Sequence, residues 1–348
     1  MPVQDEMRSD GIRVGPIGIV CNPASGKDIR RLTARASVFD NQEKLAIVRR
    51  AIQGAVAAGA REFLYVPDSH DIVATAIEEI LGQVDVGCEI VAKPLDAPQT
   101  DSAIDTTRGA RAMRDAACAV AITLGGDGTN RAFTLGWCDA PLIPISTGTN
   151  NVFPRMIEAT VAGAAAGLFA TGRVPLCEVA ARAKTIAVDV DGEATDCALI
   201  DAVLTSDRFV GSRALLDPSR LRTLLLTRAQ ASGIGMTAIG GLIDPLADDE
   251  NGGLLIEFGG GGFRVRAPIA PGRHEAIDVR RIRRVEFGEP VEVEGPGILA
   301  FDGERERVLK RGQRATLRVE RDGPWVIDVD CVHDRAARAG WFRLKASA

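Results

Sequence analysis

The sequence is poor in aromatic residues and has no excess of positive charge. Aromatic side chains make up 4% of its 348 residues, with a single tyrosine, and the formal net charge is −5. Few aromatic rings leave little surface on which bases can stack, and the net negative charge gives no overall attraction to nucleic acid or anionic lipid. We therefore do not expect a nucleic-acid-binding protein.

Paired cysteines and long apolar segments are also missing. The seven cysteines are scattered, with no C-x-x-C pair, and this pattern indicates free thiols in a reducing compartment. No window approaches the ~18 apolar residues of a membrane span. Residues 1–14 are polar, lack the apolar core of a signal peptide, and read as a mobile leader. We expect a cytoplasmic protein without integral membrane contact.

The first half of the chain alternates short apolar runs with helical patterns. The runs predict buried strands at 17–21, 63–66, 88–92, 118–124 and 142–146. Helical periodicity occurs at 41–58, 72–81 (capped by Asp71), 102–115 and 161–171, the last leading out of the domain. Strands that alternate with crossover helices form parallel sheets covered on both faces. We therefore expect an α/β domain with a Rossmann-like parallel sheet over 15–172.

After about residue 173, β-branched runs punctuated by Asp-Gly pairs replace the helical patterns. Strands are predicted at 185–190, 254–258, 263–266, 291–294, 298–301, 316–319 and 325–329. Short, regularly spaced strands with Asp-Gly turns are typical of antiparallel sheets. We expect an antiparallel all-β domain over 173–330. A C-terminal segment, 331–348, with a closing helix at 334–344, can return to the first domain.

The strongest chemical signal is Gly125-Gly126-Asp127-Gly128-Thr129, directly after the predicted strand 118–124. Ligands of open α/β sheets bind at the carboxyl ends of strands. Glycines let the backbone approach a ligand closely, and amides at a helix start can bind polyphosphate. Asp127 beside such an anion suits Mg²⁺ binding or proton acceptance. The alternative is a hairpin turn, but 131–137 does not read as the partner strand that a hairpin needs.

Three further loops are polar. Ser146-Thr147-Gly148-Thr149-Asn150-Asn151 can bind phosphate, ribose or a substrate headgroup, or can simply be a capped loop. Asn22-Pro23-Ala24-Ser25-Gly26-Lys27 lacks the upstream glycine and the following Ser/Thr of a Walker A loop. Asp302-Gly303-Glu304, taken alone, reads as a hairpin turn. The first two loops and the glycine turn follow parallel strands, so we expect them to converge on one crevice.

Together these motifs resemble the NAD kinase/diacylglycerol kinase superfamily. The glycine turn looks like its signature, Gly148-Thr149-x-Asn151-x-Phe153-x-Arg155 resembles the lipid-kinase loop, and Asp302-Gly303-Glu304 looks like its late acidic motif. The stretches NPASGKDIRRL, SVFDNQEK, STGTNNVFP, SDRFVGSRALLDP and IGMTAIGGL resemble the acetoin catabolism (AcoX) branch of ATP-NAD kinase-like proteins. This similarity covers roughly residues 16 to 245.

The resemblance implies an N-terminal α/β nucleotide-binding domain, a C-terminal β-sandwich and a site in the cleft between them. In this site a phosphoryl group would pass from ATP, with Mg²⁺, to a hydroxyl acceptor. We also expect a homo-oligomer. Asp127 would be the catalytic base. Nucleotide-binding residues would be Asn22, Ser25, Gly26, Gly125, Gly126, Gly128 and Thr129. Substrate-binding residues would be Thr147, Gly148, Thr149, Asn151 and Asp201, and Asp127 and Glu304 would bind the metal.

The acceptor stays open between alternatives. NAD kinases place an Asn-Glu pair that binds NAD on an early strand of the β domain. Residues 198–203 look like its counterpart, with Ile200 in place of the Asn and with Asp201 beside it. An apolar side chain cannot make the hydrogen bonds of an amide. NAD(H) is the first candidate, a lipid or small polyol linked to acetoin-type catabolism the second, and a non-catalytic nucleotide sensor the third. An intact Asp127 argues against the sensor.

Overall fold

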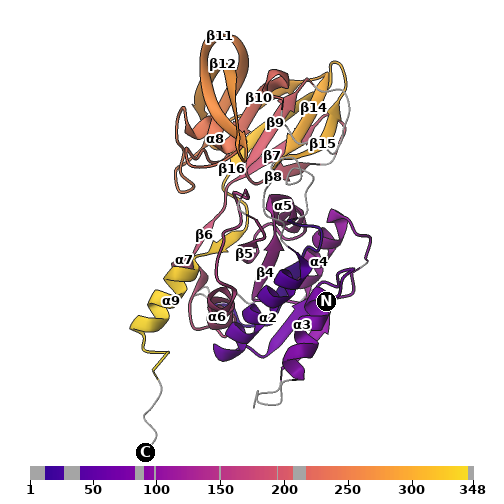
Figure 1. The fold of residues 1–348 in the computed structure, drawn as a ribbon, viewed down its shortest axis with the longest axis vertical. Coiled ribbons are helices and arrows are strands. Elements are labelled where there is room, and N and C mark those ends of the chain that lie inside the picture. Colours follow the sequence, from indigo (N-terminus) through magenta and orange to yellow (C-terminus); the bar gives the residue numbers. More distant parts are fainter. Residues whose placement is uncertain are drawn as a thin grey trace, which may run out of the picture.

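The computed structural model describes residues 12–26, 40–82, 90–97, 99–148, 150–193, 195–206 and 217–343, without the side chains of 304–306. Most of the predicted leader, Lys27, Thr149 and the start of the strand predicted at 88–92 lie outside this part. An α/β domain and a β domain follow one another along the long axis of the molecule (Figure 1).

A seven-stranded sheet forms the first domain, in the order β3-β2-β1-β4-β5-β17-β6. All neighbours are parallel except β6, which is antiparallel to β17. Three central strands, β1, β4 and β5, are buried throughout, because helices cover both faces. The bounds are β1 (Ile17–Cys21), β2 (Glu62–Tyr65), β3 (Val91–Pro94), β4 (Val120–Gly125), β5 (Pro141–Ser146), β6 (Ala180–Arg182) and β17 (Trp325–Ile327).

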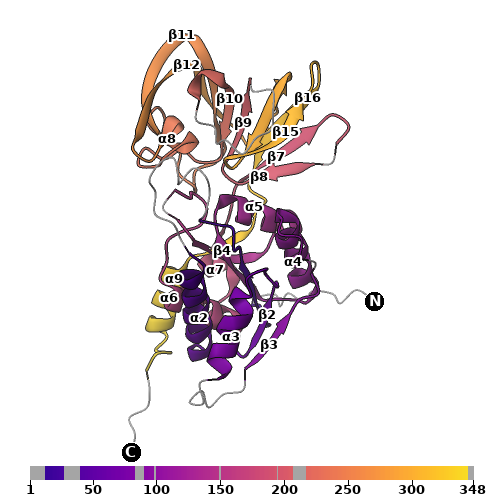
Figure 2. The same ribbon diagram turned by 45° about the vertical axis from the view of Figure 1, so that its right-hand side comes forward.

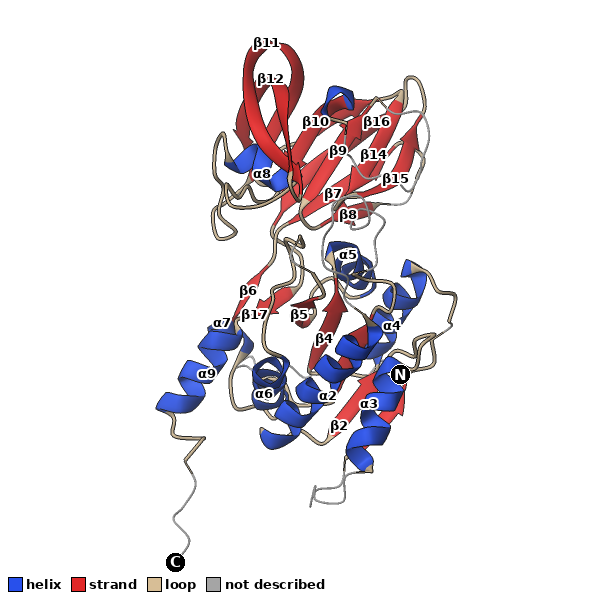
Figure 3. Cartoon of the chain, in the orientation of Figure 1, coloured by secondary structure: helices blue, strands red, loops and turns tan. Residues whose placement is uncertain are grey.

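Two layers of helices cover this sheet (Figure 3). One apolar cluster joins it to α2 (Asn41–Ala57), α3 (Ile72–Leu81), α6 (Ala159–Ala170), α7 (Leu176–Val179) and α9 (Val329–Arg338). Another joins its opposite face to α4 (Ala103–Asp115) and α5 (Asp127–Gly136). α6 packs on α2 so closely that a Cβ on Gly163 would collide with the carbonyl oxygen of Ala51. Contrary to the prediction, the chain does not leave the domain after this helix, because α7 and β6 still belong to the first domain.

The second domain contains two antiparallel sheets, β12-β11-β10-β9-β14-β15 and β13-β16-β7-β8. One apolar core lies between them, and a second lies under α8 (Met236–Gly241) on the outer face of the larger sheet. Figure 2 shows the long β11–β12 hairpin curling beside α8. The other bounds are β7 (Thr185–Val190), β8 (Asp196–Ala198), β9 (Asp201–Thr205), η1 (Pro218–Arg220), β10 (Leu221–Leu226), β11 (Gly253–Ala270), β12 (Arg273–Val285), β13 (Val291–Glu294), β14 (Gly297–Phe301), β15 (Glu304–Leu309) and β16 (Arg314–Glu320).

The end of the chain differs from the prediction. The strand predicted at 325–329 as part of the β domain is β17, which pairs with β5 of the first sheet. The final helix begins at Val329 rather than at 334, because the side chain of Asp328 caps it by accepting from the amide of Cys331 at 3.0 Å. The helix then lies beside α6, against the first domain (Figure 1).

Within the described ranges, no helix is long and apolar enough to cross a membrane.

Candidate active site

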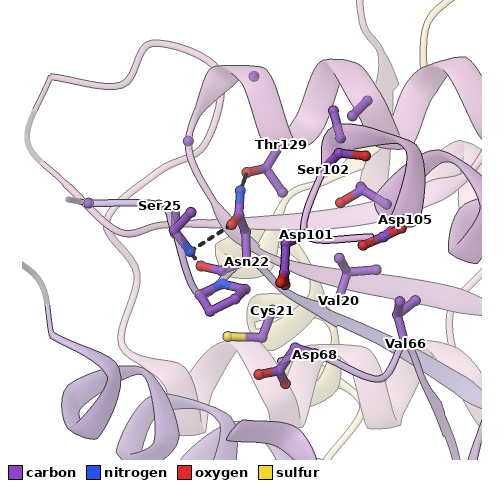
Figure 4. A pocket seen from close by; sticks show the side chains of 18 of the residues that line it. Val20, Cys21, Asn22, Ser25, Val66, Asp68, Asp101, Ser102, Asp105 and Thr129 are labelled. Carbon is purple, nitrogen blue, oxygen red and sulfur yellow. Dashed lines mark hydrogen bonds between the residues drawn. The ribbon is translucent and has the colours of Figure 1, made fainter. Parts of the chain in front are cut away.

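A cavity of about 790 Å³ lies at the carboxyl ends of the first domain's parallel strands. The loops that follow β1, β2, β3, β4 and β5 all contribute to its lining, and Asp302 contributes from the β domain. Figure 4 labels lining side chains that follow the first four of these strands, among them Asn22, Asp68, Asp101 and Thr129. Eight predicted site residues line it: Asn22, Ser25, Gly26, Gly126, Asp127, Gly128, Thr129 and Asn151. The expected convergence of loops therefore produces one concave site.

The glycine turn joins a strand to a helix and is not a hairpin. β4 ends at Gly125, Gly126 is the N-cap, and α5 begins at Asp127. The buried side chain of Asn130 donates to the carbonyl oxygen of Gly126 at 2.8 Å and accepts from Oγ1 of Thr123 at 2.7 Å. These bonds fix the turn and place the positive end of α5 at the cavity, where it favours an anion such as phosphate.

The loop after β1 is tied directly to this turn. Nδ2 of Asn22 donates to Oγ1 of Thr129 at 2.8 Å, as Figure 4 shows. Oδ1 of Asn22 accepts from the amide of Ala24 at 2.9 Å, and its carbonyl oxygen accepts from Oγ of Ser25 at 2.7 Å. Asn22 thus orders its own loop and joins two predicted nucleotide-binding segments.

Asp127 lies in the first turn of α5 and lines the cavity. Its carboxylate accepts from the amides of Val152, at 3.0 and 3.1 Å, and Phe153, at 2.8 Å. Removal from water raises the pKa of Asp127 to about 6; the amide of Phe153 opposes this shift, and nearby Asp302 adds to it. A carboxyl group with a pKa near neutrality suits proton acceptance at physiological pH.

Asp302 is a cavity-lining residue that was not among the predicted site residues. It occupies the β14–β15 turn with a φ of 49°, and its buried carboxylate accepts from the amides of Leu199, Ile200 and Asp201 at 2.7–3.2 Å. Burial raises its pKa. The Asp302-Gly303-Glu304 motif was the signal that could have identified Asp302. Glu304 was predicted instead as the acidic site residue, and its side chain lies outside the described part.

Of the predicted substrate residues that the structure describes, Asn151 lines the cavity, whereas Thr147, Gly148 and Asp201 do not. Thr147 and Gly148 are buried, and the amide of Thr147 donates to the carbonyl oxygen of Gly125 at 3.2 Å. Asn151 lines the cavity, and its Nδ2 donates to Oγ of Ser146 at 2.8 Å. Asp201 is buried in β9 and does not line the cavity.

Ile200 also lies away from the cavity. It is 1% exposed and packs in an apolar cluster with Phe133, Phe153 and Leu199, where the two domains meet. The position expected from the sequence to be the counterpart of an NAD-binding Asn is therefore part of the domain junction.

The loop after β2 contains a second cavity-lining carboxylate that was not among the predicted site residues. Asp68 lines the cavity and accepts from the amides of His70 and Ile72, both at 3.0 Å. Asp71, the predicted cap of α3, makes no side-chain capping bond. No pattern in the sequence shows which of these two aspartates accepts from the amides at the start of α3.

The carboxylates on the cavity suit a metal ion that binds together with a nucleotide. They suit a permanently bound metal ion less well. In the described part of the chain, no three His, Cys, Asp or Glu side chains form a metal-binding group. Mg²⁺ is commonly held by one or two carboxylates together with substrate phosphates and water. Asp127 and Asp302, both on the cavity, suit this arrangement.

Comparison with known proteins assigns the family. A family model of the ATP-NAD kinase N-terminal domain matches residues 17–174, and one of the acetoin catabolism protein X C-terminal domain matches 184–322. The chain is 36% identical over 332 residues to acetoin catabolism protein X of Cupriavidus necator, covering 92% of each chain. It belongs to the acetoin catabolism protein X family. The kinase domain of this family supports phosphotransferase chemistry, whereas the family name states no reaction.

The fold extends to a solved kinase. The crystal structure of yeast NADH kinase complexed with NADH matches with a TM-score of 0.52 and 12% identity, over 97% of this chain and 91% of that one. The similarity covers both domains and shows a shared fold, an N-terminal parallel sheet with helices followed by antiparallel β-sheets.

Proposed function

We propose that this protein transfers a phosphoryl group from MgATP to a hydroxyl group of a small molecule, with NAD(H) as the first candidate acceptor and NADP(H) as the product. The observation that carries the proposal is the position of Asp127, in the first turn of α5 and on the cavity where the glycine turn meets the Asn22 loop. The free thiols and the nucleotide chemistry agree with a cytoplasmic site of action.

The residues have distinct proposed roles. The positive end of α5 and the segments around Gly126, Gly128, Thr129 and Asn22 would hold the ATP phosphates, with Ser25 and Gly26 on the nucleotide side. Gly125, Thr147 and Gly148 would support this wall from behind. Asn151 would orient the acceptor, Asp127 would take its hydroxyl proton, and Asp201 and Glu304 would join the surrounding polar network. Phosphoryl transfer depends mainly on such positioning and charge neutralisation.

A second acceptor class is favoured by one observation. Ile200 is packed into the domain junction instead of offering an amide to a dinucleotide. A lipid or small polyol is therefore the alternative acceptor, and nucleotide sensing without turnover is the third possibility.

Asp127→Asn tests the proposal. The asparagine side chain keeps one oxygen for the amides of Val152 and Phe153, so the fold and MgATP binding should persist. Turnover should fall by about 10²–10⁴-fold, the usual contribution of a positioned base. The assay follows ATP consumption with NAD, NADH and a panel of lipids and polyols. Turnover within a few-fold of wild type would remove Asp127 from this role, and ATP binding without turnover on any acceptor would favour a sensor.

A further inference from the structure

Among the residues that the structure describes, two lysines are completely buried, Lys44 in α2 and Lys184 between β6 and β7, each with 0% exposure. Lysine is almost never fully buried unless its ammonium group is bonded. Each of these Nζ atoms donates to three oxygens, but the two sets belong to different parts of the molecule. This difference gives Lys44 a role that Lys184 does not share.

Lys44 holds the loop that carries Asn22. Its Nζ donates to the carbonyl oxygens of Asn22 at 3.1 Å and Pro23 at 2.8 Å, and to Oδ1 of Asn41 at 3.2 Å. Both carbonyl-bearing residues line the cavity. Bonds from a charged donor are about twice as strong as neutral ones. The ammonium group therefore fixes the backbone of this loop from beneath.

The effect of Lys44 extends to the glycine turn through Asn22. The amide of Asn22 donates to the carbonyl oxygen of Leu124 at 3.0 Å, and its side chain donates to Thr129 at 2.8 Å. A shift of the Asn22 backbone would change both contacts. Two walls of the cavity, from β1 and from β4, thus depend on one buried ammonium group in α2.

We propose that Lys44 is a positioning residue for the phosphoryl donor: it holds the Asn22-Pro23 loop against the glycine turn in the geometry that binds MgATP. The inference rests on the proposed function, since it assumes that the cavity takes a nucleotide. Lys44 acts through Asn22 and Pro23 and need not touch the nucleotide.

Lys184 provides a matched control. Its Nζ donates to the carbonyl oxygens of Ala247 at 3.1 Å, Glu250 at 2.9 Å and Gly252 at 3.3 Å, none of which lines the cavity. Lys44→Met and Lys184→Met each remove a buried ammonium group together with these bonds. Asn41→Ala is a milder third variant that removes only one acceptor of Lys44 and keeps the lysine.

Calorimetric titration of the full chain with MgATP, together with melting temperatures, separates a role in MgATP binding from a role in stability alone. We expect both methionine variants to melt at lower temperature, whereas only Lys44→Met weakens MgATP binding, by about tenfold or more. Asn41→Ala should weaken it several-fold with a smaller loss of melting temperature. If Lys44→Met does not fold, the comparison of Asn41→Ala with Lys184→Met decides.

Two results would overturn the inference in different ways. MgATP affinities of the Lys44 and Asn41 variants within twofold of the Lys184 variant would show that Lys44 serves stability alone, with the kinase proposal intact. Absence of MgATP binding by the wild-type protein would instead remove the proposed function, and the role of Lys44 with it.

Discussion

Nη2 of Arg131 in α5 donates to Oδ1 of Asp196 in β8 at 2.8 Å, and this ion pair joins the helix of the glycine turn to the β-sandwich. Nε of Arg131 also donates to the carbonyl oxygen of Cys197 at 2.6 Å, and its guanidinium lies 5.0 Å from the ring centroid of Phe301. The helix that begins at the glycine turn is thereby fixed to the domain that supplies Asp302.

Arg131→Met should lower the free energy of unfolding by roughly 3 kcal/mol, because it leaves a buried carboxylate without one of its partners. The two side chains are only 8% and 11% exposed. Arg307 still reaches Asp196 at 3.1 Å, which places the loss at the lower end of the range for such pairs. Urea unfolding measures the change.

The exposed pair Arg49–Glu79, with exposures of 37% and 40%, supplies the control. Arg49→Met should cost less than about 1 kcal/mol. The double variant Arg131→Met/Asp196→Asn should recover part of the loss, since it buries no unpaired charge. Equal losses for Arg131→Met and Arg49→Met would mean that Arg131 does not hold the domains together.

Asp127 should give the protein a defined pH dependence. Its pKa is raised from 3.8 to about 6 in the folded chain, chiefly by burial. A raised carboxyl pKa means that the folded state binds the proton more tightly, so the stability it contributes is present below pH 3.8 and is lost as pH rises through 6. The amide that Asp127→Asn introduces has no proton to lose in this range. The melting temperature of this variant, relative to wild type, should therefore rise between pH 4 and about 6.5 in nucleotide-free protein.

Asp217→Asn is the contrasting control. Hydrogen bonds from Ser219 lower the pKa of this exposed carboxyl, so its contribution is lost as pH falls. The relative melting temperature of Asp217→Asn should change only slightly and in the opposite sense, falling as pH rises. A flat difference between Asp127→Asn and wild type across pH 4–6.5 would show that the pKa of Asp127 is not raised. For catalysis, a raised value predicts that turnover declines below about pH 6.

Much of the first domain could be predicted because buried parallel strands are continuous apolar runs. Residues 17–21 and 118–124 predicted the centre of the sheet, and β1 and β4 lie there. The apolar pattern of a short strand does not indicate which neighbouring strand it pairs with. β17 has three residues, and only packing determines that it joins β5 rather than the β-sandwich.

The strands of the β domain were harder to predict, because a glycine run in one of them resembles a turn. Four glycines at 259–262 look like a turn, but Phe258 and Phe263 both pair with Val279, so the glycines form a bulge within the single strand β11. In the site, the glycine turn could be found from its residue types. Lys44 could not, because a lysine in an amphipathic helix reads as a surface residue and only the tertiary contacts bury it.

Gly126→Ala should separate binding from stability. An added Cβ would lie 2.9 Å from Oδ1 of Asn151, at the end of a side chain that can move. We expect a small change in melting temperature, with MgATP or acceptor binding weakened by about tenfold because Asn151 and the turn both line the cavity. Calorimetry and thermal melting measure the two effects.

Gly125→Ala should damage both properties. Its Cβ would lie 2.5 Å from Oγ1 of Thr129, the atom that accepts from Asn22, and overpacking of this kind typically costs about 1–3 kcal/mol. Gly260→Ala is the control, because a Cβ there meets nothing within 4 Å. If Gly126→Ala lowers stability as much as Gly125→Ala while MgATP binding is unchanged, the turn is structural and does not bind phosphate.

The last prediction concerns the acceptor and residue 200. Ile200→Asn places an amide in the apolar cluster of the domain junction, among Phe133, Phe153 and Leu199. An unsatisfied buried amide costs about 1–3 kcal/mol, so this variant should lose stability. Ile200→Val, which only removes a methylene, should lose about 0.5–1.5 kcal/mol. Because Ile200 does not line the cavity, neither variant should lower KM for NAD, even if NAD is the acceptor of the wild-type protein.

Steady-state kinetics with NAD, NADH, lipids and polyols, together with melting temperatures, test whether residue 200 faces the acceptor and which acceptor the protein uses. A lower KM for NAD in Ile200→Asn, at an unchanged melting temperature, would mean that residue 200 faces the acceptor and that the apolar junction is not its environment. Undetectable NADP(H) formation by wild type, with active phosphorylation of another alcohol, would exclude NAD as the acceptor and retain the kinase. In that case Ile200, which is buried where the two domains meet, is a packing residue of the domain junction and takes no part in binding the acceptor.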